Sequence, residues 1–129
     1  ANLTNANLTN ANLSRANLTN ANLTDVNLTN AILTNAILVK TRIQNADLSK
    51  VKLSYANING SEISNVIFVG AHLNSTKIFN SKINNSDMTG ANLYNADLTK
   101  TKLTNVKFDN TVFCKTVMPS GLDNSGCKG

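Results

Sequence analysis

The chain has 129 residues, of which 41% are hydrophobic, 5% aromatic and 15% charged, and its net charge is +5. This apolar content is too high, and the charged content too low, for a disordered chain, and the length suits one domain rather than two. No run of about 18 apolar residues occurs, so the sequence contains no candidate transmembrane helix.

A five-residue repeat starts at the first residue and continues without a slip for 23 units, over residues 1–115. The third residue of every unit is large and apolar, from Leu3 to Phe113, and the first is always Ala, Val, Ser or Thr. The other positions are mostly polar, and the chain contains 24 asparagines. Such self-similarity indicates a solenoid.

A repeat of five residues fits neither an α-helix nor a regular β-strand. In a helix, successive third residues would be turned by about 140° and would spread around the cylinder. In a strand, an odd period would move the apolar residue to the opposite face at every repeat. A coil in which each unit forms one side fits the pattern, with the large third residue on the axis and the small first residue at the corner.

The A(N/D)LxN units resemble those of the pentapeptide-repeat proteins, over about nine-tenths of the chain. The resemblance implies an all-β fold, a right-handed quadrilateral β-helix with four units per coil. The 23 units would then make nearly six coils and a rod about 27 Å long at the usual strand spacing.

The register is expected to end near Lys115, so the sequence predicts a β-helix over 1–115 and a capping tail over 116–129 within the same domain. The tail, TVMPSGLDNSGCKG, holds the only proline and three of the six glycines. We expect Cys114 and Cys127 to form a disulfide that folds the tail over the final coil; the alternative is a free buried cysteine and an inert tail. A zinc site is not expected, because two cysteines and the distant His72 do not make a ligand set.

The segment FCKTVMPSGLDNSGC resembles the tail of cyanobacterial and plant thylakoid-lumen members of the family. Together with a disulfide, this resemblance implies an exported or lumenal protein, in the periplasm or thylakoid lumen, with the cytoplasm as the alternative. No signal peptide is present, which implies a mature or shortened chain. At the other end, we expect either that the natural chain continues upstream or that two rods stack there, giving a monomer or an end-to-end dimer.

The sequence contains few residues that could act in catalysis. A Cys114 nucleophile with His72 as base would need the two side chains in contact, but eight units, or two coils, separate them by about 10 Å. The acidic residues form no motif, and the leucine-filled interior leaves no pocket. We therefore expect no enzyme, no catalytic, metal or cofactor-binding residues, no cofactor and no small-molecule substrate.

The sequence favours a rigid scaffold or protein-interaction module with an unknown protein partner. Nucleic acid is an unlikely partner because the basic residues are sparse and few aromatic residues face outward. The predicted contact surface follows the edge between two adjacent faces and comprises Ile32, Ile37, Val39, Tyr55, Phe79 and Tyr94.

Two alternatives remain at this point. Some pentapeptide-repeat proteins imitate a DNA duplex and bind DNA gyrase, but such mimicry needs a negative rod and the net charge here is +5. Ice binding is the second alternative, although the threonine columns are interrupted, as in Thr4, Thr24, Gln44, Ser64, Asn84, Thr104.

Overall fold

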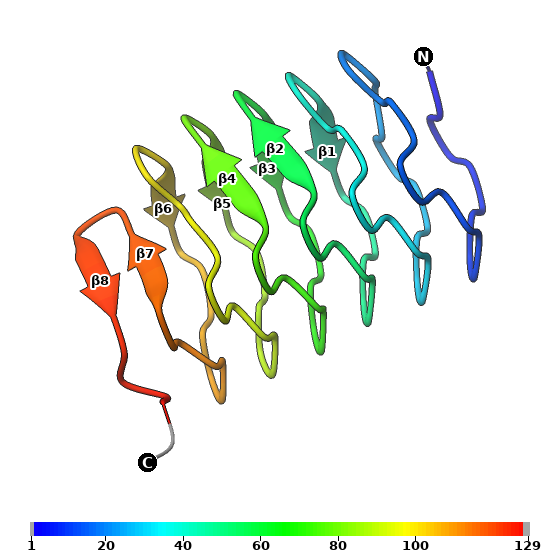
Figure 1. Ribbon diagram of the computed structural model, residues 1–129. Helices are drawn as coiled ribbons and strands as arrows, with labels where there is room; N and C mark the ends of the chain where they lie inside the picture. The colour runs from blue at the N-terminus through cyan, green and yellow to red at the C-terminus, as the bar shows by residue number, and fades with distance from the viewer. Residues whose placement is uncertain (1, 128–129) are drawn as a thin grey trace.

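The computed structural model describes residues 2–127, and Figure 1 shows them winding into a stack of coils with the two ends of the chain at opposite ends of the rod. Lys128 and Gly129, which belong to the expected capping tail, and Ala1, with which the first unit begins, lie outside the described residues.

Short strands occur on two sides of the coil and in the tail. Four of them form a parallel sheet in the order β1 (Arg42–Gln44), β3 (Glu62–Ser64), β5 (Lys82–Asn84) and β6 (Lys102–Thr104). Two more, β2 (Asn57–Asn59) and β4 (Lys77–Phe79), pair in parallel, and β7 (Thr116–Met118) pairs antiparallel with β8 (Gly121–Asp123).

The second residue of each unit pairs with the residue 20 positions away, and these pairings make four parallel ladders, which we call sides 1 to 4. Side 1 contains Asn2, Asn22, Arg42, Glu62, Lys82 and Lys102; side 2 contains Asn7, Asn27, Asp47, Ile67, Asp87 and Lys107. Side 3 contains Asn12, Ile32, Lys52, His72, Asn92 and Val112; side 4 contains Asn17, Ile37, Asn57, Lys77, Asp97 and Val117. The quadrilateral β-helix with four units per coil is confirmed.

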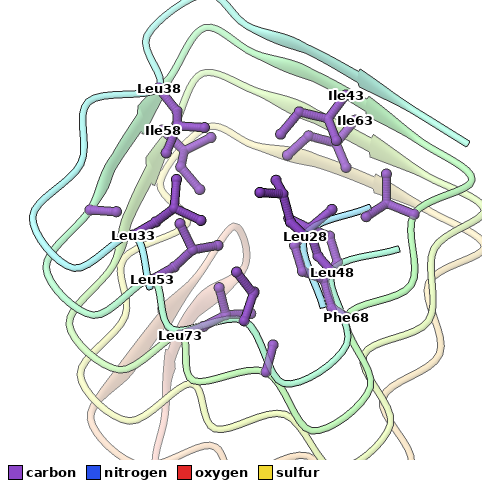
Figure 2. Packing of buried hydrophobic residues seen from close by; sticks show 14 of the residues in the cluster. Leu28, Leu33, Leu38, Ile43, Leu48, Leu53, Ile58, Ile63, Phe68 and Leu73 are labelled. Atoms are coloured by element: carbon purple, nitrogen blue, oxygen red, sulfur yellow. The ribbon is translucent and has the colours of Figure 1, made fainter. Parts of the chain in front are cut away.

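The large third residues fill the lumen in vertical stacks. Figure 2 shows Leu28, Leu48 and Phe68 above one another, and each of the three is at most 2% exposed. Burial weakens at the two ends of the rod, where third residues such as Leu3 and Phe113 are only partly buried. The lumen is therefore a continuous apolar column from the second coil to the fifth.

Most units turn, and a minority extend; the extended units of β1 to β6 have isoleucine at the third position, except that of β6, which has Leu103. In a turning unit the next first residue closes the corner, as when the Ala6 N–H donates to the Leu3 carbonyl at 3.0 Å. Each third-position isoleucine lies instead in a strand, which fits the preference of β-branched residues for extended backbone. These residues are Ile43, Ile58, Ile63, Ile78 and Ile83.

Polar residues at the second, fourth and fifth positions of the units stabilise the turns. The Asn22 side-chain oxygen accepts hydrogen bonds from the Thr24 N–H at 3.1 Å and from the Thr24 hydroxyl at 2.6 Å. The fifth residue then takes a left-handed conformation, as at Asp25 with a φ of 59°. Asparagine tolerates this conformation better than most residues, which explains its frequency at the fifth position.

The register runs one unit beyond the expected boundary at Lys115. Val117 pairs with Asp97, and the Leu98 N–H donates to the Val117 carbonyl at 2.7 Å, so β7 forms the fourth side of the sixth coil. The sequence of this unit, TVMPS, keeps a small first residue and an apolar third residue, Met118. Its proline follows at the fourth position and does not break the pairing.

The tail follows the backbone edge of the last coil. Strand β8 pairs with the free edge of β7, and Leu122 within it remains 65% exposed. The apolar end of the lumen is closed in part by the Phe108 and Phe113 rings, which meet edge to face with centroids 5.4 Å apart. The tail thus covers polar backbone groups, while an aromatic pair occupies the axis.

Candidate functional site

Any site within residues 2–127 must lie on the outer surface of the coils. Third residues from Leu23 to Leu98 are at most 2% exposed, so the lumen holds only tightly packed side chains. Among residues 2–127, no group of three or more His, Cys, Asp and Glu side chains is placed to hold a metal ion. No helix within this range is long and apolar enough to cross a membrane.

The six residues of the predicted contact surface divide between two adjacent sides. The units of side 3 carry Ile32, Tyr55 and Tyr94, and those of side 4 carry Ile37, Val39 and Phe79. On side 4 the structure does not join the apolar residues, because Asn59 lies between Val39 and Phe79 in the same column. Ile37 is followed on the next rung by the polar Asn57.

Tyr55 is the outlier on side 3. Its side chain is 63% exposed, and its backbone is left-handed with a φ of 62°. Asparagine or glycine occupies most of the equivalent corners, and a bulky aromatic residue is disfavoured in this conformation. The chain therefore accepts backbone strain to hold an aromatic ring in solvent.

Tyr94 continues this side two coils further along. Its ring is 41% exposed, and the neighbouring Val112 is 39% exposed. The Lys115 ammonium lies 5.9 Å from the Tyr94 ring centroid, within the range of a cation–π contact. Tyr94 belongs to the column of Cys114, because the Asn95 N–H donates to the Cys114 carbonyl at 2.8 Å.

Side 3 differs from the other three sides in the charges that it carries. Its units carry the cations Arg15, Lys52 and Lys115 together with His72, and no acidic residue. Each of the other sides includes at least one carboxylate, for example Glu62, Asp87 and Asp97. Side 3 therefore combines exposed aromatic rings with positive charge.

A hollow of about 490 Å³ opens at the C-terminal end of side 3. Its lining residues are Tyr94, Val112, Cys114, Lys115, Gly126 and Cys127. The two cysteines form a disulfide, with Cα atoms 4.8 Å apart. Sequence reasoning singled out the disulfide and Tyr94 but missed the hollow, because the position of Gly126 against the last coil depends on the path of the tail.

Three hydrogen bonds hold this part of the tail in place. The Gly126 N–H donates to the Phe113 carbonyl and the Lys115 N–H to the Asn124 side chain, both at 2.7 Å. The Cys127 N–H donates to the Asn124 carbonyl at 3.1 Å. A Cβ at Gly126 would lie 3.0 Å from the Phe113 nitrogen, so this close approach requires glycine.

The structure keeps His72 and Cys114 apart. His72 lies on the side 3 ladder two rungs before Val112, with Asn92 between them, and Cys114 belongs to the unit of Val112. The Cys114 sulfur is also engaged in the disulfide. A nucleophile–base pair of these two residues is therefore not formed.

The threonine hydroxyls that ice binding would require are used internally. The Thr24 and Thr29 hydroxyls donate to the side-chain oxygens of Asn22 and Asn27 at 2.6 and 2.7 Å. In the next coil Gln44 and Ser49 replace these threonines, so the columns do not continue as uniform threonine arrays.

These features define a β-solenoid repeat protein with a packed interior and its available chemistry on the outer sides. The model of the family described as pentapeptide repeats matches residues 1–38, 38–70 and 71–110, with eight copies. The chain belongs to the pentapeptide-repeat family.

Solved structures agree on the fold. The pentapeptide repeat protein Rfr23 from the cyanobacterium Cyanothece 51142 is 24% identical with a TM-score of 0.61, over 86% of this chain and 90% of that one. QnrB1, a plasmid-mediated fluoroquinolone resistance protein, is 18% identical with a TM-score of 0.47, over 91% of this chain and 63% of that one. The likeness to Rfr23 concerns the fold alone, and the weaker likeness to QnrB1 adds nothing to it. No curated protein sequence matches the chain.

Proposed function

We propose that the protein is a non-enzymatic, rigid interaction module that binds a protein partner through side 3. The observation that carries this proposal is Tyr55, an aromatic residue held 63% exposed in a left-handed conformation. Strain of this kind persists where the surrounding structure enforces it, and it concentrates at functional positions. Membership of the pentapeptide-repeat family supports the general role of a structural or interaction module.

The chemistry of side 3 suggests what the partner offers. Tyrosine rings and Ile32 supply contact area at a small entropic cost, and tyrosine is common at the energetic centres of interfaces. Lys52 and Lys115 lie on the same side without a carboxylate. An acidic protein surface with an apolar centre would complement this side.

The second half of the predicted contact surface belongs to the same proposal with a smaller part. Ile37 follows the corner between sides 3 and 4 and is 37% exposed, so it would border the contact. Val39 and Phe79 are partly buried and separated by Asn59. We expect them to contribute less to binding than Tyr55 and Tyr94.

Quantitative co-purification from the native host tests the proposal. The double variant Tyr55→Asn/Tyr94→Asn should lose a partner that the wild-type chain enriches. Ile67→Asn is the matched control, because Ile67 is 43% exposed on side 2. Equal enrichment of every partner by the wild type and the double variant would refute a role for side 3.

We further propose that the protein is exported or lumenal. The Cys114–Cys127 disulfide supports this assignment, because such bonds persist in oxidising compartments. Alkylation of free thiols in intact cells, followed by mass measurement, should leave both cysteines unmodified. Two alkylated thiols in protein recovered from the cytoplasmic fraction would instead point to the cytoplasm.

A further inference from the structure

The disulfide at the end of side 3 is open to solvent on one of its two partners. Cys127 is exposed and Cys114 is half-buried, and both sulfur-bearing residues line the 490 Å³ hollow. A structural disulfide usually lies under packed side chains, whereas here the hollow gives an approaching molecule access to the bond. Reactivity of a disulfide toward a thiolate depends on such access.

We propose that Cys114–Cys127 is a thiol–disulfide exchange site for dithiol reductants, and that its reduction releases the tail from the last coil. The proposal does not depend on partner binding through side 3. The substrate class is a protein or small molecule that carries two neighbouring thiols.

The exchange is balanced in two steps. A reductant thiolate attacks the sulfur of Cys127, the more exposed of the two residues, forms a mixed disulfide with it and displaces Cys114 as a thiolate, which takes up a proton. The second reductant thiol then loses its proton and attacks its own partner sulfur, displacing Cys127 as a thiolate that is protonated in turn. The reductant leaves as a disulfide, having supplied the two electrons that the cysteines accept.

Lys115 is placed to favour the first step. It follows Cys114 directly in the chain and lines the same hollow. Positive charge near a cysteine stabilises the thiolate, and a more stable thiolate is a better leaving group. Lys115 is therefore a positioning residue for the exchange and not a catalytic one.

Besides the disulfide, only backbone pairing and exposed hydrogen bonds fix the end of the tail up to Cys127. Residues 124–127 are all exposed, and Leu122 is 65% exposed, so this segment contributes no apolar anchor. The remaining attachments are the β7–β8 pairing and the hydrogen bonds to Phe113 and Lys115. Exposed hydrogen bonds of this kind open more readily than the buried ladder of the coils.

The first experiment treats the full chain with dithiothreitol under native conditions and follows intact mass after thiol alkylation and amide hydrogen exchange. We expect two alkyl groups to be added while the lumen amides of Leu53 and Leu73 stay protected. The amides of Lys115 and Gly126, which donate across the tail contact, should lose protection. The variant Cys114→Ser/Cys127→Ser should show the same loss without a reductant.

Two outcomes would overturn the proposal. Reaction of the disulfide only at urea concentrations that unfold the coils would make it a structural bond without native access. Full protection at Lys115 and Gly126 in the reduced chain would show that the tail stays docked. Comparison of Lys115→Gln with Lys107→Gln tests the positioning role, and we expect only Lys115→Gln to slow reduction, by about two- to fivefold.

Discussion

The Ser81 hydroxyl accepts a hydrogen bond from the Ser61 N–H, 20 residues earlier in the chain, at 3.1 Å inside the lumen. The same hydroxyl donates to the Ile58 carbonyl at 3.1 Å. In most turning units the two equivalent backbone groups bond each other directly, as the Ala6 N–H and the Leu3 carbonyl do. Here the extended unit 56–60 separates the two groups, and a serine from the next coil bridges the gap.

The arrangement recurs at the same corner of neighbouring coils. The Thr41 N–H donates to the Ser61 hydroxyl at 3.1 Å, and that hydroxyl donates to the Leu38 carbonyl at 2.7 Å. In the same way, the Thr101 hydroxyl accepts a hydrogen bond from the Ser81 N–H and donates one to the Ile78 carbonyl. Buried first-position hydroxyls therefore satisfy the backbone groups that an open corner leaves free, as buried polar groups require.

Removal of one such bridge should be costly. Ser81→Ala would leave the Ser61 N–H and the Ile58 carbonyl unpaired in the lumen, so we expect a loss of about 1–3 kcal/mol in the free energy of unfolding. Urea denaturation gives the measurement, and Ser120→Ala, at an exposed tail position, is the control. Equal midpoints for the two variants would contradict the bridging role.

The packing of the lumen predicts that the stability lost on truncating a third residue depends on the position of that residue along the rod. Leu73 is 0% exposed, and Leu73→Ala should lower the free energy of unfolding by about 2–5 kcal/mol, because it removes packed atoms and leaves a cavity. Leu8 is only partly buried in the first coil, so Leu8→Ala should cost clearly less. A comparable loss in both variants, measured by urea denaturation, would argue against a weaker end coil.

Tyr55 should show a conflict between stability and binding. Tyr55→Asn replaces a strained aromatic residue by one that tolerates a positive φ, so we expect the thermal midpoint to rise, corresponding to about 0.5–1 kcal/mol. Asn95→Gln is the reverse control at an equivalent corner with a φ of 59° and should lower the midpoint. A lower midpoint in Tyr55→Asn would remove the argument from strain.

The Asp87 carboxylate predicts the direction in which the stability of the fold changes with pH. Hydrogen bonds from the Thr89 hydroxyl and N–H, with the nearby Lys107, hold the pKa of Asp87 below its ordinary value of 3.8. A depressed pKa stabilises the fold above the ordinary value, and this contribution disappears as the pH falls through the folded-state value. Asp87→Asn keeps the turn acceptor but does not titrate at this position.

The measurement compares urea midpoints of the wild type and Asp87→Asn between pH 6 and pH 2. We expect the wild type to lose more stability than the variant as the pH falls below about 4. Parallel curves for the two proteins would show that the Thr89 hydrogen bonds do not couple Asp87 to folding.

The repeat predicted most of the fold because each unit faces the same physical choice. A large residue such as Leu33 must be buried, a small one such as Ala36 fits the corner, and asparagine tolerates the left-handed conformation. The division between turning and extended units was not predicted. Five of the six strands β1 to β6 have isoleucine at the third position and β6 has Leu103, so the preference of isoleucine for extended backbone acts together with the stacking of neighbouring coils.

The candidate site was predicted less completely. Periodicity assigned Tyr55 and Tyr94 to one face, because the units 51–55 and 91–95 are 40 residues, or two coils, apart. It could not predict the hollow or the continuation of the register to Met118, since the tail sequence departs from the repeat. The position of Gly126 against Phe113 is a tertiary contact without a local signal.

The four-unit coil also limits how the chain can gain or lose residues during evolution without moving its outer side chains to a different side. Loss or gain of a single five-residue unit would rotate everything downstream by a quarter turn, so that the residues of one side would continue on its neighbour. A change of 20 residues would lengthen or shorten the rod and leave every outer column aligned. Descendants of this sequence that keep Tyr55 and Tyr94 on the same side are therefore expected to differ in length between these two residues by whole coils.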